Sequence, residues 1–266
     1  MRIAEAVLRA LSRKPDSSDY NQDSEREARG TELSLLQREF PQLTALVKGK
    51  RIVDFGCGTG RQSIALVMEG ASYVYGVDTN AHTLTKAKRL ACEMGIPHNR
   101  LTFTEHPPSD VIGTFDVVIS QNSMEHFSDP IRAVTEMKRL IHQRGTILIT
   151  FGPPWFAPYG SHMHFFCKVP WLNILFSERT VMTVRALYRN DGATRYEDVE
   201  SGLNKMTIQK FEKIISQGGL LLQYKRYSCV KGQNWMSRLP FLRELFVNHI
   251  SCVLALEKRR GAPPDR

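Results

Sequence analysis

Three glycines within five positions follow a short apolar stretch that contains an acidic residue. The stretch is VDFGCGTG at residues 53–60, with Asp54 ahead of Gly56, Gly58 and Gly60. Because glycine has no Cβ, a turn built from it lets a ligand lie directly against the backbone. When such a turn joins the first strand of a parallel sheet to the first helix, the ligand lies at the carboxyl ends of the strands. The sequence therefore predicts a ligand-binding loop here.

The class of ligand follows from the glycine spacing and from the acid. Proteins that bind dinucleotides use GxGxxG, in which the pyrophosphate meets the start of the helix. Here Arg61 holds the position of the third motif glycine, and the carboxylate of Asp54 would lie unfavourably close to a pyrophosphate. S-adenosylmethionine has an ammonium and a sulfonium and no phosphate. We therefore favour S-adenosylmethionine over a dinucleotide.

The segments around this loop must form the sheet that positions it. Strand-like apolar stretches alternate with helix-like segments, which is typical of a parallel, doubly wound sheet. We expect strands at residues 51–56, 73–78, 100–105, 115–120, 146–151, 220–230 and 250–258, and helices at 61–70, 81–95, 128–145 and 207–219. The fold class expected is α/β, a Rossmann-like, doubly wound, mostly parallel seven-stranded sheet with helices on both faces.

Two regions depart from this alternation. Residues 1–48 form an N-terminal helical arm and linker, with a polar stretch at 15–30 and a helix broken near Pro41. Residues 49–266 form the ligand-binding domain, and residues 152–205 within it form an insertion or lid on the acceptor side, rich in proline and aromatics. The first helix of the arm either docks on the body or lies on a surface.

The charge and the cysteines limit the partners and the compartment. The 266-residue chain has a formal net charge of +9 and a pI near 9.4, which favours anionic partners. The basic residues are spread along the chain, the densest cluster being residues 258–260, so a solvated basic surface is the simpler interpretation. Five scattered cysteines without a CxxC pair predict no disulfide framework or zinc site and favour a reducing, cytoplasmic compartment.

Four motifs in order resemble those of a known family. VDFGCGTG, GVD at the end of the second strand, FDVVISQNSMEHFSDP and RGTILIT are similar to the successive motifs of class I S-adenosylmethionine-dependent methyltransferases, in particular the group that acts on small molecules, lipids and sugars. The resemblance covers residues 50–155 well and the rest loosely. It implies S-adenosylmethionine as cofactor and S-adenosylhomocysteine as product.

The resemblance also implies roles for individual residues. The three glycines would let the loop approach the methionine and ribose portions, and Asp54 would fix the loop and bind the amino group. Asp78 would accept hydrogen bonds from both ribose hydroxyls, with Thr79 against the adenine. Gln121 and Asn122 would line the methionine side.

One motif of the family is missing. Many relatives carry an acid after the third strand that receives the adenine amino group. This chain has TEHPPSD there, so Glu105, His106 or a backbone carbonyl is left for that contact.

Three histidines lie where an acceptor could meet the cofactor. Methyl transfer is an in-line displacement, and a neutral imidazole suits removal of the acceptor proton near pH 7. His126 follows the fourth strand, and His162 and His164 follow the fifth, on one side if that segment is extended. We expect one of the three to act as the base, although the position of His126 is commonly structural in relatives. No metal is expected, because no acid accompanies the histidines at ligand spacing.

Aromatic residues crowd the same insertion. They are Trp155, Phe156, Tyr159, Phe165, Phe166, Trp171 and Phe176. They form either a small satellite core or the wall of an apolar acceptor pocket. Together with the apolar residues of 235–246, they suggest a small-molecule or amphiphilic acceptor. The basic charge further suggests contact with an anionic membrane surface. The protein would then be cytoplasmic and peripheral to that membrane.

Two other functions remain open from the sequence. An RNA or protein methyltransferase fits the basic charge, but the Asn/Asp-Pro-Pro-aromatic signature of base amino methylation is absent after the fourth strand, so a nucleic acid is the less expected partner. A non-catalytic subunit would bind the cofactor and show no turnover. The sequence predicts neither the acceptor nor the oligomeric state.

Overall fold

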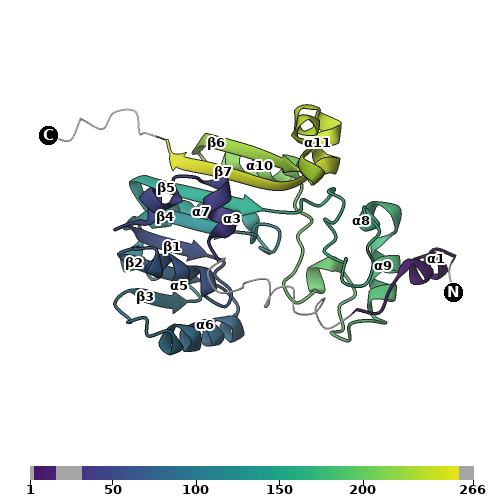
Figure 1. The fold of residues 1–266 in the computed structure, drawn as a ribbon, viewed down its shortest axis with the longest axis horizontal. Coiled ribbons are helices and arrows are strands. Elements are labelled where there is room, and N and C mark those ends of the chain that lie inside the picture. Colours follow the sequence, from purple (N-terminus) through teal and green to yellow (C-terminus); the bar gives the residue numbers. More distant parts are fainter. Residues whose placement is uncertain (1–2, 16–31, 258–266) are drawn as a thin grey trace.

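A computed structural model describes residues 3–15 and 32–257 of the chain. Most of the polar stretch expected at 15–30, and the basic cluster at 258–260, lie outside the described residues. In the described part, seven strands form one sheet in the order β3-β2-β1-β4-β5-β7-β6 (Figure 1). Only β7 runs antiparallel to its neighbours there. The expected mostly parallel α/β sheet is confirmed.

The elements follow the predicted alternation. The strands are β1 (Arg51–Phe55), β2 (Tyr73–Val77), β3 (Leu101–Thr104), β4 (Phe115–Gln121), β5 (Ile141–Phe151), β6 (Leu220–Cys229) and β7 (Val247–Leu256). The helices are α1 (Ile3–Leu11), α3 (Ser34–Glu39), α4 (Leu43–Val47), α5 (Arg61–Met68), α6 (Ala81–Glu93), α7 (Pro130–Leu140), α8 (Leu172–Leu175), α9 (Glu178–Arg185), α10 (Ile208–Gln217) and α11 (Pro240–Phe246). Short 3-10 turns are η1 (Ser109–Val111), η2 (Tyr196–Asp198), η3 (Val230–Gly232) and η4 (Asn234–Arg238).

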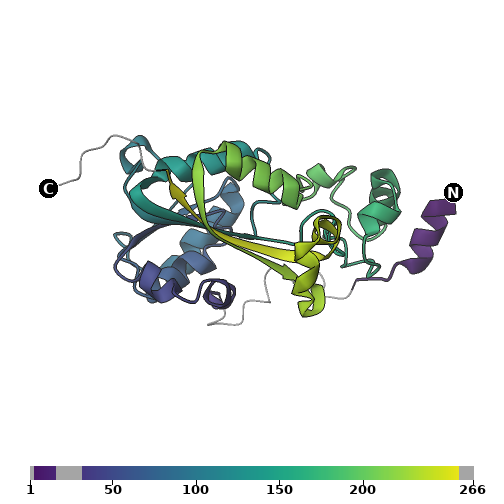
Figure 2. The same ribbon diagram turned by 90° about the horizontal axis from the view of Figure 1, so that it is seen from above.

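Helices cover both faces of the sheet because its central strands are apolar on both faces. In β1, Ile52 belongs to the core built with α3, α4, α5 and α6, whereas the next residue, Val53, belongs to the core built with α7 and α10. Figure 2 shows the two layers, with green α10 on one side of the sheet and purple α3 and α4 on the other. The carboxyl ends of the parallel strands are thereby left as the accessible edge.

Two predicted boundaries are wrong. The helix expected to continue to Gly145 ends at Leu140, and Ile141 already belongs to β5, where it pairs with Phe115 across a bulge. A Cβ at Gly145 would lie 2.7 Å from the Cβ of Ile141, so this glycine serves the bulge and not a helix end. β7 likewise begins at Val247, earlier than the predicted residue 250.

The N-terminal helices are fastened to the body at two places. The break at Pro41 falls between α3 and α4, as predicted. The buried carboxylate of Glu39 at the end of α3 accepts a hydrogen bond of 2.9 Å from Ser251 Oγ on β7. Further upstream, the fully buried Leu8 of α1 packs into the core of the insertion, and the backbone N–H of Arg13 donates to Phe166 O at 2.8 Å. The first helix therefore docks on the insertion.

Residues 152–205 form a lobe with its own core. They contain α8, α9 and η2 and no strand, as expected. Phe165, Phe166 and Tyr196 are buried there, with Trp155 and Phe176 packed against them. Much of the aromatic cluster is thus a satellite core, which leaves Phe156 and Tyr159 exposed. In the described part of the chain, no helix is long and apolar enough to span a membrane.

Candidate functional site: a glycine loop and a histidine pair

The three glycines of the β1–α5 loop have different surroundings. All three have positive φ, +83° at Gly56, +49° at Gly58 and +77° at Gly60, a conformation that side chains rarely adopt. A Cβ at Gly56 would lie 2.5 Å from Ser123 Oγ, and one at Gly60 would lie 2.6 Å from the Phe103 ring. A Cβ at Gly58 would meet nothing within 4 Å. Gly56 and Gly60 therefore allow close packing within the protein, while Gly58 leaves bare backbone open to a ligand.

Two carboxylates hold this loop. The buried Asp54 accepts hydrogen bonds from Gln62 Nε2 at 2.7 Å and Ser63 Oγ at 2.6 Å, which fixes the start of α5. Asp78, at the end of β2, accepts from the backbone N–H of Gly58 at 2.8 Å through one oxygen and from that of Asn80 at 2.9 Å through the other. Each oxygen of Asp78 keeps a further lone pair for a hydroxyl donor.

The loop after β4 lies at the same edge of the sheet as the glycine loop. Asn122 has a φ of +50°, and its backbone N–H donates to Thr150 O of β5 at 2.8 Å. Within the described part of the chain, the buried Oε1 atoms of Gln62 and Gln121 have no hydrogen-bond partner. Unpaired buried acceptors require a donor, because leaving them unsatisfied is destabilising. Each of these two acceptors can take a hydrogen bond from a ligand donor.

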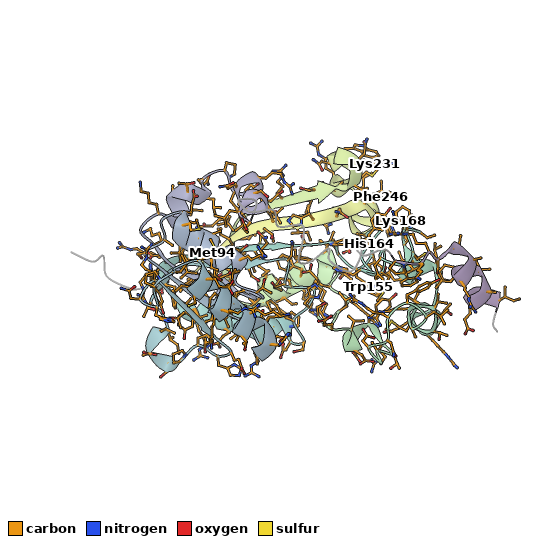
Figure 3. All side chains as sticks on the ribbon, turned by 60° about the horizontal axis from the view of Figure 1, so that its bottom comes forward. Met94, Trp155, His164, Lys168, Lys231 and Phe246 are labelled. Atoms are coloured by element: carbon orange, nitrogen blue, oxygen red, sulfur yellow. The ribbon has the colours of Figure 1, made fainter. Side chains whose placement is uncertain are left out.

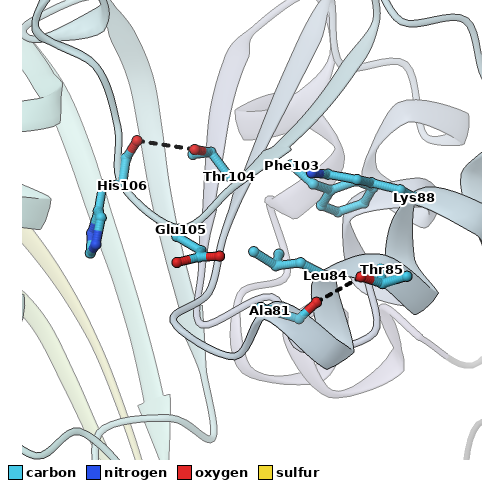
Figure 4. A pocket seen from close by; sticks show the side chains of 8 residues that line it. All are labelled: Ala81, Leu84, Thr85, Lys88, Phe103, Thr104, Glu105 and His106. Carbon is cyan, nitrogen blue, oxygen red and sulfur yellow. Dashed lines mark hydrogen bonds between the residues drawn. The ribbon is translucent and has the colours of Figure 1, made fainter.

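A pocket of about 380 Å³ lies beside the loop that follows β3. It is lined by Ala81, Leu84, Thr85, Lys88, Phe103, Thr104, Glu105 and His106. Figure 4 shows the Glu105 carboxylate on the α6 side of this loop and the His106 ring turned away from α6. Of the two side chains proposed for the missing adenine contact, Glu105 is thus the one turned toward α6. Thr79, the residue predicted to lie against the adenine, is exposed on the neighbouring loop after β2.

Cys57, within the glycine loop, serves packing. Burial raises the pKa of its thiol far above the usual range, with Asp54 and Asp78 adding to the shift. A thiol held in the neutral form is a poor nucleophile.

Two of the three predicted histidines meet after the ends of β4 and β5. The rings of His126 and His162 lie edge to face with centroids 5.5 Å apart. His126 Nδ1 donates to Gly202 O at 2.7 Å, which anchors that ring. His164 instead packs against the ring of Tyr159, with centroids 6.3 Å apart. Among the described residues, no group of three or more His, Cys, Asp and Glu side chains could hold a metal ion.

The His162 imidazole is neutral near pH 7. Burial, helped by the proximity of His126, lowers its pKa to about 4. Its buried Nε2 has no hydrogen-bond partner within the described chain. A neutral ring nitrogen of this kind is available to accept a proton or a hydrogen bond.

Sequence reasoning missed Glu125, the neighbour of His126. Its carboxylate is buried, and Oε1 accepts from the backbone N–H of Gly152 at 3.3 Å, which ties the loop after β4 to the start of the insertion. Burial raises the pKa of Glu125. The signal available in the sequence was an acid directly beside a candidate histidine.

Comparisons with known proteins find a methyltransferase domain in this chain. A methyltransferase-domain family model matches residues 53–149, which include the glycine loop, Asp78 and the loop after β4. The ubiquinone biosynthesis O-methyltransferase of Chromobacterium violaceum is 28% identical over 120 residues, covering 45% of this chain and 51% of that protein. The chain thus spans about half the length of this curated relative.

Solved structures show the same fold. An S-adenosylmethionine-dependent methyltransferase from Mesorhizobium loti superposes with a TM-score of 0.52 at 18% identity, covering 81% of this chain and 96% of that chain. The magnesium protoporphyrin IX methyltransferase of Synechocystis, solved with bound S-adenosylhomocysteine, superposes with a TM-score of 0.50 at 16% identity over 96% of this chain and 100% of that chain. The strand order, the glycine loop and the family match together identify a methyltransferase domain of the class I S-adenosylmethionine-dependent type in this chain, with the family match spanning residues 53–149.

Proposed function

We propose that the chain transfers a methyl group from S-adenosylmethionine to an oxygen of a small-molecule or amphiphilic acceptor. The observation that supports this proposal is that the residues we assign to the cofactor and those we assign to the acceptor follow strands that end at one edge of the sheet. Gly58 and Asp78 follow β1 and β2, while His126 and His162 follow β4 and β5. The curated relatives named as O-methyltransferases of ubiquinone biosynthesis support an oxygen acceptor.

The cofactor would be held by the loops after β1, β2 and β4. Asp78 has lone pairs left for two ribose hydroxyls, and Gln121 offers an unpaired acceptor for the amino group. When bound, S-adenosylmethionine supplies a methyl group already activated by its sulfonium. The task left to the chain is to align the acceptor, exclude water and receive the acceptor proton.

The acceptor proton would pass to Nε2 of His162. As the acceptor oxygen gains the methyl group, its O–H bond breaks and the proton moves to the unpaired ring nitrogen. A pKa of about 4 makes His162 a weak base. It would therefore accept a hydrogen bond from the acceptor hydroxyl early in the displacement and take its proton late. His126, anchored to Gly202, holds the His162 ring edge to face.

Calorimetric titration with S-adenosylhomocysteine, alongside NAD, tests the cofactor site. Wild type should bind S-adenosylhomocysteine with a Kd of roughly 1–100 μM and should not bind NAD. Asp78→Ala should weaken binding at least about tenfold, because it removes the acceptor for the ribose hydroxyls and releases Gly58 N–H. Asp110→Ala, which removes an exposed acid on η1, is the matched control.

The outcomes separate the possible functions. Failure of the wild type to bind S-adenosylhomocysteine would rule out the cofactor site. Tight binding with no release of S-adenosylhomocysteine from S-adenosylmethionine, across phenolic, sugar, RNA and peptide acceptors, would identify a non-catalytic cofactor-binding subunit instead.

A further inference from the structure

A group of apolar side chains is exposed at the end of the molecule that carries the histidines. Phe241 on α11 is 88% exposed, and Leu175 on α8 is 62% exposed. Trp235, Leu239 and Ile174 are also exposed. We call these five residues the apolar rim; four lie on α8, η4 and α11, and Leu239 lies between η4 and α11. In Figure 1, α8 and α11 lie at the same end of the molecule, beyond the carboxyl ends of β4 and β5.

The two segments of the apolar rim are joined. The ring of Trp171, directly before α8, lies edge to face against Phe246 at the end of α11, with centroids 5.6 Å apart. Trp171 Nε1 also donates to Leu245 O at 3.3 Å. The insertion and the β6–β7 connection, which carry the rim residues, therefore contact each other directly.

The charges near the rim are positive. Lys168, Lys231 and Arg238 are exposed beside it. Residues 152–176 contain no Asp or Glu, and residues 229–246 contain one acid, Glu244. Glu244 is turned to the start of α10, where it accepts backbone hydrogen bonds from Ile208 and Gln209. Figure 3 shows Lys231 and Lys168 at the same end of the molecule as His164, and Met94 far from them.

We propose that the apolar rim docks onto an anionic lipid bilayer. Side chains such as Trp235 and Phe241 suit the boundary between headgroups and acyl chains, and exposed lysine and arginine are attracted to anionic headgroups. A protein partner would require a fitted surface, whereas a bilayer accepts separate apolar side chains that project from short helical turns. The docking does not depend on the proposed methyl transfer.

Vesicle flotation tests the docking directly. Wild type should float with vesicles of phosphatidylglycerol and phosphatidylcholine, and remain with the soluble fraction when the vesicles are pure phosphatidylcholine. Phe241→Ser combined with Leu239→Ser should reduce the floated fraction on the order of tenfold, while Phe241→Trp should retain it. Lys231→Glu with Arg238→Glu should reduce it similarly, and high salt should weaken wild-type binding.

Two controls keep the result specific. Met94→Ser removes an exposed apolar side chain at a distant position and should float as the wild type does. S-adenosylhomocysteine affinity should be the same in all rim variants, which shows that they fold and separates this proposal from the cofactor site. Absence of wild-type flotation, or equal flotation of Phe241→Ser with Leu239→Ser, overturns the proposal. If the wild type does not float but self-associates, and the double variant does not self-associate, the rim is an interface between copies of this chain and the proposal is overturned.

Discussion

At the scale of the residue, His162 combines three features that bear on its proposed role as proton acceptor. Its backbone φ is +55°, its pKa is lowered to about 4 by burial, and its buried Nε2 has no partner in the described structure. The left-handed backbone also explains a difference from the sequence argument. An i, i+2 pair shares one side only in an extended segment, and here His162 faces His126 while His164 packs on Tyr159.

Substitution of these histidines tests the proton acceptor. His162→Ala should lower turnover by roughly 10²-fold without weakening S-adenosylhomocysteine binding, because it removes an acceptor-side nitrogen only. Turnover is measured as S-adenosylhomocysteine release with a panel of phenolic and sugar acceptors. His164→Ala is the companion variant, and unchanged turnover in both would refute the assignment of a base to this segment.

At the scale of the element, the glycines of the β1–α5 loop differ in their surroundings, since Gly56 and Gly60 face packed side chains and Gly58 faces open space. Gly60→Ala should lower the free energy of unfolding by roughly 2–4 kcal/mol, because it adds a clash with Phe103 to the strain of positive φ. Gly58→Ala should lower it by only about 1–2 kcal/mol, since its Cβ enters open space. Chemical denaturation measures both effects.

The same variants separate stability from binding. Gly58→Ala should weaken S-adenosylhomocysteine binding in calorimetry, because the new methyl group projects where the ligand meets the backbone. Gly113→Ala is the control, since Gly113 has a φ of +69° with open space but lies far along the chain, between η1 and β4. If Gly58→Ala binds as tightly as Gly113→Ala, Gly58 does not face the cofactor.

Elements that depend on residues close together in the sequence could be predicted, whereas those that depend on contacts between distant residues could not. The strands and helices around the glycine loop followed from apolar periodicity, and Pro41 marked a real break. The α7–β5 boundary was missed because Ile141 is drawn into the sheet by pairing with Phe115, a contact between distant residues. The docking of α1 on the insertion depends on Leu8 entering a separate core, which helical spacing alone cannot specify.

At the scale of the whole molecule, two imidazoles in different parts of the fold make stability depend on pH. Burial lowers the pKa of His162 in the insertion loop to about 4, and burial likewise lowers that of His249 on β7 to about 4. The carboxylate of Glu39, which lies near His249, also loses its stabilising contribution as the pH falls, but in a lower pH range. Although burial alone would raise its pKa, hydrogen bonds from Arg38 and Ser251 lower it below 4.5, so its contribution is lost only below that pH.

At each of these two histidines, the unfolded chain therefore binds more protons than the folded chain between pH 6.5 and pH 4. Glu125 opposes this trend, because burial raises its pKa and the folded chain then binds more protons at that carboxyl. The contribution of the two histidines to stability is full above about pH 6.5, the ordinary histidine pKa, and falls as the pH decreases toward 4. At pH 5 each histidine should reduce the free energy of unfolding by about 2 kcal/mol relative to pH 7.5.

His249→Asn should flatten this decline, as should His162→Asn, whereas His98→Asn, which changes an exposed side chain, should leave it as in wild type. Urea denaturation at several pH values measures the slope. Equal slopes in wild type and both buried-site variants would show that neither imidazole is kept neutral by the fold, and the proton acceptor role of His162 would lose its physical basis.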